Sequence, residues 1–137
     1  MARNETAVKI INVGYSAGSI NIPLPTTNTV FTDSVYIGDC LNREIGAGAI
    51  LNGILSSANT IVTLEQAYGL PVVEGSADAL YVAVQTINIT AVGTWNYVAL
   101  LSSNVNAVTP YIRFKVTSVT TNTSSTVNIK LCKQVSG

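Results

Sequence analysis

The sequence predicts an all-β fold, a single antiparallel β-sandwich of the jelly-roll or Ig-like type that spans residues 1–137. β-Branched residues, which favour strands, occur along the whole chain. Several short segments alternate apolar and polar residues with a period of two, which is typical of strands with one buried face. Gly, Pro, Asn and Ser separate these segments, as they do at turns. A chain of 137 residues can bury one substantial core.

The N-terminal third predicts three short strands. The first ends at Gly14, and residues 1–13 are expected to form an N-terminal arm or an edge strand. Gly18 favours a turn before the second strand, and Pro23 restricts that strand to an edge or a strand end because proline cannot donate a hydrogen bond to the ladder. The predicted strands are residues 7–13, 19–24 and 30–37.

The segment from residue 45 to residue 55 is apolar, small and rich in glycine, and it matches neither strand nor helix periodicity. We expect a long apolar, glycine-rich loop there, followed by a helical turn near residues 63–68. A long loop in a compact domain is often functional, and an apolar one suits an arm that orders against a neighbouring protein. The alternative is a pair of core strands. The apolar side chains of the expected loop are the candidate partner-binding residues: Ile45, Ala47, Ile50, Leu51, Ile54 and Leu55.

The last third of the chain shows the clearest alternation. Within the candidate strand of residues 111–119, apolar residues alternate with Arg113 and Lys115, which are therefore expected to face water. Short turns between consecutive strands predict an antiparallel meander. The predicted strands are residues 80–90, 95–101, 111–119 and 127–131, with Ile112, Phe114, Val116, Val127, Ile129 and Leu131 directed inward.

Charged residues make up only 10% of the chain, where about 25% is usual. Residues 1–78 hold all seven acidic and three basic side chains, whereas residues 79–137 hold four basic ones and no acid. We interpret this pattern as two halves of one sandwich whose surface charges offset each other. The alternative is head-to-tail attraction between copies of the chain in an assembly. Four scattered basic residues are too few for a nucleic-acid interface, and no segment is long and apolar enough to cross a membrane.

The sequence offers no catalytic or metal-binding motif, so we expect no enzyme, no cofactor and no metal site. Histidine is absent, which excludes nucleophile–histidine pairs. Cys40 and Cys132 are far apart and form no Cys-x-x-Cys motif, so we interpret them as thiols, with a disulfide between them as the alternative. The seven acidic residues are scattered along the chain and predict neither a calcium site nor a catalytic carboxylate pair.

Three aromatic residues have two possible roles. Trp95 and Tyr97 are two positions apart on one candidate strand and therefore share a face, and Tyr111 begins a later strand. Burial in the core is the expected arrangement, because aromatic side chains dominate the cores of small domains. The alternative is a carbohydrate-binding module, in which Trp95, Tyr97 and Tyr111 are exposed and stack on sugars.

Four segments follow one another in the last part of the chain: a Val-Gln strand at residues 81–90, Gly93-Thr94-Trp95, a strand ending in Ser-Asn at residue 104, and Tyr-Ile-Arg-Phe at residues 111–114. In the order of these segments, residues 79–133 resemble small β-sandwich virion proteins of tailed bacteriophages, of the capsid decoration or cement type. The sequence departs from the pattern after residue 104, where Val-Asn stands in place of Asp-Gly.

The resemblance implies a non-enzymatic structural protein that binds the major capsid protein or another virion protein as a homo-oligomer, with a trimer favoured. It implies a location in the virion, on the capsid or, as the alternative, as an adhesion component of the tail or neck that uses exposed aromatic residues. No apolar signal segment follows Met1, so we expect synthesis in the host cytoplasm. Two segments are candidates for the contact with the particle: the N-terminal residues 2–13 and the apolar residues 45–55.

Overall fold

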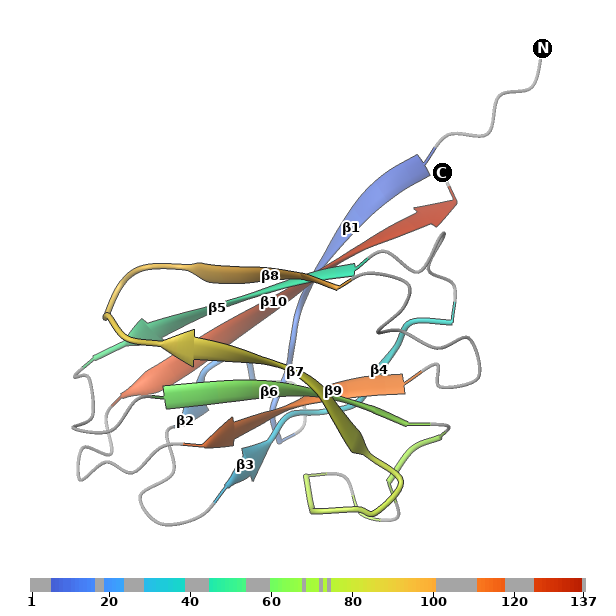
Figure 1. Ribbon diagram of the computed structural model, residues 1–137, viewed down its shortest axis with the longest axis horizontal. Coiled ribbons are helices and arrows are strands. Elements are labelled where there is room, and N and C mark those ends of the chain that lie inside the picture. Colours follow the sequence, from blue (N-terminus) through green and yellow to red (C-terminus); the bar gives the residue numbers. More distant parts are fainter. Residues whose placement is uncertain are drawn as a thin grey trace.

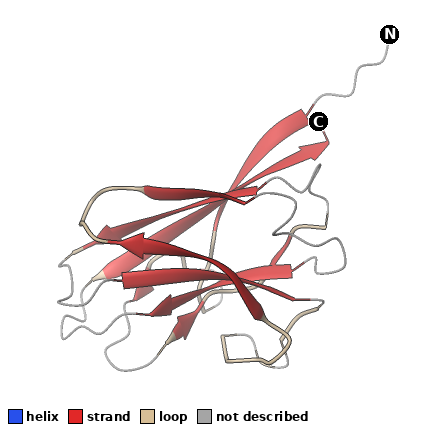
Figure 2. Ribbon diagram, viewed as in Figure 1, coloured by secondary structure: helices blue, strands red, loops and turns tan. Residues whose placement is uncertain are grey.

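The computed structural model of the chain describes residues 6–16, 19–23, 29–38, 45–53, 60–67, 69–71, 73, 75–100, 111–117 and 125–136. Within these ranges every regular element is a strand (Figure 2). The strands are β1 (Thr6–Asn12), β2 (Ile22–Pro23), β3 (Val30–Phe31), β4 (Val35–Tyr36), β5 (Ile45–Asn52), β6 (Thr60–Ala67), β7 (Val82–Ile89), β8 (Asn96–Leu100), β9 (Tyr111–Thr117) and β10 (Thr126–Ser136).

The strands form two antiparallel sheets that pack together as a sandwich (Figure 1). One sheet has the order β1-β10-β5-β8, with the short β2 also paired to β10. The other has the order β3-β9-β6-β7, with β4 also paired to β9. The predicted all-β sandwich is confirmed, and its first strand is at the edge of a sheet.

The strand pairs are nested. β1 pairs with β10, β3 and β4 pair with β9, β5 pairs with β8, and β6 pairs with β7. A chain paired in this way is one long two-stranded ribbon wrapped around a core, which is the jelly-roll arrangement rather than the Ig-like one. The predicted meander is wrong, because β7, β8, β9 and β10 alternate between the two sheets.

The core lies between the sheets and contains the residues that the period-two pattern directs inward. Phe114 and Leu131 are completely buried, and the other four predicted residues of β9 and β10 are buried with them. The remaining core side chains come from both sheets: Val13, Ile22, Ile37, Ile45, Ala47, Ala49, Leu51, Val62, Leu64, Ile87 and Ile89.

The glycine-rich segment is a strand over its described part. Residues 45–52 form β5, between β10 and β8, and residues 60–67 form β6. The expected loop at residues 45–52 and the expected helical turn near residues 63–68 are therefore wrong, and the alternative of two core strands is confirmed there. Pairing with strands distant in sequence outweighs the low strand propensity of Gly and Ala. Ile54 and Leu55 are outside the described residues.

Candidate functional site

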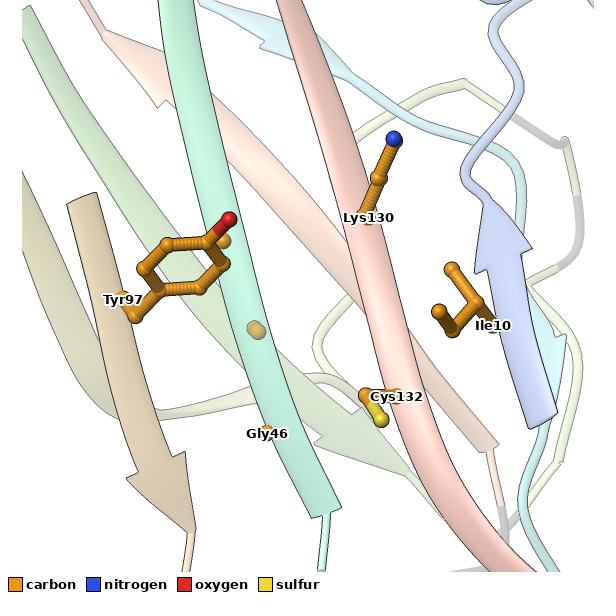
Figure 3. A pocket seen from close by; sticks show the side chains of 7 residues that line it. Ile10, Gly46, Tyr97, Lys130 and Cys132 are labelled. Atoms are coloured by element: carbon orange, nitrogen blue, oxygen red, sulfur yellow. The ribbon is translucent and has the colours of Figure 1, made fainter. Parts of the chain in front are cut away.

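The outer face of the sheet β1-β10-β5-β8 carries a groove of about 430 Å³ (Figure 3). The register between the strands determines which residues line the groove. One row across the sheet places Lys130 of β10 opposite Gly48 of β5, and Gly48 opposite Tyr97 of β8. The adjacent row places Ile10 opposite Cys132, and Cys132 opposite Gly46. The groove therefore combines residues from four strands that are far apart in the sequence.

Two glycines form the floor of this groove. Gly46 and Gly48 are two residues apart, so both lie on the outer face of β5, while Ala47 and Ala49 between and after them face the core. A Cβ atom added to Gly48 would lie 2.5 Å from Cε1 of Tyr97. Glycine at this position therefore allows the ring of Tyr97 to reach across β5 (Figure 3).

Tyr97 and Trp95 form an aromatic pair on this outer face. Their ring centroids are 6.0 Å apart and their planes differ by 19°. Tyr97 is 71% exposed, whereas Trp95 is half-buried, and the ammonium group of Lys130 lies 5.1 Å from the centroid of the Trp95 ring. The expected core position is wrong for Tyr97. Periodicity establishes that the two rings share a face but does not establish which face is buried.

An amide network occupies the same face beyond Lys130. The Nδ2 group of Asn128 donates hydrogen bonds to the backbone oxygen of Ile20 at 2.7 Å and to Oδ1 of Asn21 at 3.0 Å. Oδ1 of Asn128 accepts a hydrogen bond from Nδ2 of Asn52 at 2.6 Å. Polar groups therefore border the aromatic pair on the side of β10.

The other predicted site residues, which are Tyr111 and the candidate partner-binding residues, do not lie together in this groove. Tyr111 belongs to the opposite sheet, where its half-buried ring makes an edge-on contact with Tyr36 at 5.5 Å. Of the candidate partner-binding residues, Ile45, Ala47 and Leu51 are buried in the core, and Ile50 is half-buried. Side chains that fill the core are not available to a partner.

The edge strand β1 is a second exposed feature. Its register with β10 is regular over seven residue pairs, and no other described strand pairs with it. The amide of Val13 donates to the backbone oxygen of Ile129 at 2.9 Å. Because amides in a strand alternate in direction, those of Val8 and Ile10 are directed away from β10. Ile10 is 64% exposed, and β1 extends with the end of β10 beyond the other strands (Figure 1).

Sequence reasoning missed the contributions of Ile10, Lys130 and Cys132 to the groove. Their only signal is the alternation within β1 and β10, which fixes their face but not their neighbours. None of the residues that line the groove is a carboxylate. Among the described residues, no group of three or more acidic, Cys or His side chains is placed to hold a metal ion, and no helix is suited to cross a membrane.

The groove offers a ligand one exposed phenol ring, one amine, one thiol and a glycine floor. No protein-family model matches the sequence, and a comparison with curated proteins finds no similar chain.

Proposed function

We propose that the chain is a non-enzymatic structural virion protein, which decorates or cements a bacteriophage capsid by binding major capsid protein subunits. The resemblance in residues 79–133 and the low charged fraction support this role. The jelly-roll architecture also supports it, because viral capsid domains are among the proteins built in this way. Since lectins share the architecture, the proposal depends mainly on the surface that makes the contact.

The exposed edge of β1 is the observation that carries the proposal. Of the two candidate contact segments, the described part of residues 45–55 has its larger apolar side chains buried or half-buried, which favours the N-terminal segment. An extended partner segment can add to an exposed sheet edge through backbone hydrogen bonds. β7 is also an edge strand, but its register with β6 shifts at Leu64/Glu65, and such irregularity disfavours strand addition. β8 is an edge of only five residues.

Several copies of this contact, made by one oligomer, together provide the affinity for the particle. A single added strand contributes few hydrogen bonds, but a homo-oligomer engages several capsid subunits at once. The second and third contacts are then intramolecular, so modest affinities combine through effective concentration. A trimer at a symmetry point of the shell is the arrangement we propose.

The experiment is to purify particles from a lysate of the host in which the chain is made and to quantify the chain by mass spectrometry against the major capsid protein. We expect the chain in the particles at a fixed ratio to the capsid subunit. Recombinant protein added to particles that lack it should sediment with them. Absence of the chain from the particles, together with no sedimentation of added protein, would contradict the proposal.

A further inference from the structure

We propose that the groove above Gly46 and Gly48 is a saccharide-binding site in which a pyranose ring stacks on Tyr97. This inference goes beyond the proposed virion role and does not depend on it. The groove lies on the outer face of the sheet, where the side chain of Ile10 from β1 is part of its lining, whereas the proposed contact with the particle is made by the backbone edge of β1.

The exposed ring of Tyr97 is the first argument. An aromatic side chain that is 71% exposed offers water a flat apolar surface that the described residues cover only in part. The face of an aromatic ring carries partial negative charge, and the C–H groups on one face of a pyranose carry partial positive charge, so the two surfaces attract each other. Half-buried Trp95 lies next to Tyr97 with a nearly parallel ring and supports it from one side.

The floor of the groove is the second argument. Because Gly46 has no side chain, a ligand can approach the backbone of β5 closely there, beside the Tyr97 ring, which itself covers Gly48. The volume of about 430 Å³ is within the range of about 300–1,000 Å³ that is usual for small-ligand sites. Such sites are mainly apolar and have a few polar groups that orient the ligand, which is the composition found here.

The polar groups favour a saccharide over an apolar peptide. The ammonium group of Lys130 supplies hydrogen-bond donors, and sugar hydroxyl and ring oxygens are suitable acceptors. The amides of Asn52 and Asn128 continue this polar border. Most glycoside hydrolases use a pair of carboxyl groups, and the lining of the groove contains none, which favours binding of the sugar over its cleavage.

The test has two steps. The full chain is applied to a glycan array, and the glycans it retains are then titrated by saturation-transfer NMR with the corresponding methyl glycosides at millimolar concentrations. Tyr97→Ala removes the platform. Gly48→Ala keeps the tyrosine but forces its ring to move, and because the ring is an exposed, flexible side chain the fold should survive. Tyr36→Ala is the matched control, since Tyr36 is 52% exposed on the other sheet.

We expect the wild-type chain and Tyr36→Ala to bind the same saccharides with equal affinity. Tyr97→Ala and Gly48→Ala should each weaken binding about tenfold or more, with unchanged circular dichroism. The inference is overturned if the wild-type chain retains no glycan, or if Tyr97→Ala binds as well as the wild type. It is also overturned if no saccharide binds and Tyr97→Ala abolishes binding to phage particles, because the groove is then a protein-docking surface.

Discussion

The guanidinium group of Arg113 is buried on the outer side of β9, where its Nε atom donates a hydrogen bond to Oε1 of Glu65 at 3.0 Å. The alternation in β9 predicted a solvent-facing Arg113. The connection between β6 and β7 instead covers it: Nη1 donates to the backbone oxygen of Ser76 at 2.6 Å. The ring centroids of Phe31 and Tyr81 each lie 4.2 Å from the guanidinium carbon of Arg113. Arg113 thus holds the connection against the sheet.

Replacing Arg113 with Met should destabilise the fold strongly. The change leaves the buried carboxylate of Glu65 without its cationic partner, and breaking such a pair costs about 3–5 kcal/mol. Urea denaturation followed by circular dichroism measures the loss. The double variant Arg113→Met/Glu65→Leu should recover most of it, because no charge then remains uncompensated. A loss below about 1 kcal/mol for the single variant would contradict this role for Arg113.

Tyr81→Phe tests the second anchor of the same connection. The hydroxyl groups of Tyr81 and Ser34 share a hydrogen bond at 2.7 Å, and the substitution removes it while the ring stays beside Arg113. We expect a decrease of about 1 kcal/mol in the free energy of unfolding. Tyr81→Leu should cost more, because it also removes the cation–π contact. Equal losses for the two variants would show that the ring contact contributes nothing.

Phe114→Ala and Tyr97→Ala should differ sharply in their effect on stability. Phe114 is completely buried between the sheets, so its truncation should cost about 3–5 kcal/mol. Tyr97 is mostly exposed on the outer face, so its truncation should cost less than about 1 kcal/mol. Thermal and urea denaturation of both variants measure the difference. A large loss for Tyr97→Ala would mean that the ring belongs to the packed structure rather than to a binding surface.

The oligomeric state is open to direct measurement. The chain has a mass of 14.4 kDa, and the proposed virion role favours a trimer. Size-exclusion chromatography with light scattering should therefore give three times the mass of one chain. A monomer at all concentrations would contradict the proposed avidity of a preformed oligomer.

The sequence predicts the parts of this fold that depend on local alternation. β9 and β10 have a period of two, and their inward residues, such as Phe114 and Leu131, are buried as predicted. Local alternation does not encode which strands pair, so the exchange of β7 to β10 between two sheets could not be predicted. Sequence patterns do not predict β5, because Gly46 and Gly48 have low strand propensity. These glycines are in a strand because β5 pairs with β10 and β8.

The candidate site was predictable only in part, for related reasons. The shared face of Trp95 and Tyr97 follows from their spacing, but their outward direction depends on how β8 pairs with β5. Lys130 and Ile10 reach the groove through register with strands at opposite ends of the chain. Burial of Arg113 depends on the path of the connection between β6 and β7, which no periodic pattern describes.

The proposed binding of the virus particle by the edge of β1 can be tested with the variant Val8→Pro. The amide of Val8 is directed away from β10, so proline there removes a donor from the free edge and leaves the ladder to β10 in place. Val8→Thr keeps the amide and serves as the control. Each protein is mixed with particles that lack the chain and sedimented through a density gradient. We expect the wild type and Val8→Thr to sediment with the particles and folded Val8→Pro to remain unbound; wild-type binding by Val8→Pro would show that the β1 edge does not make the contact.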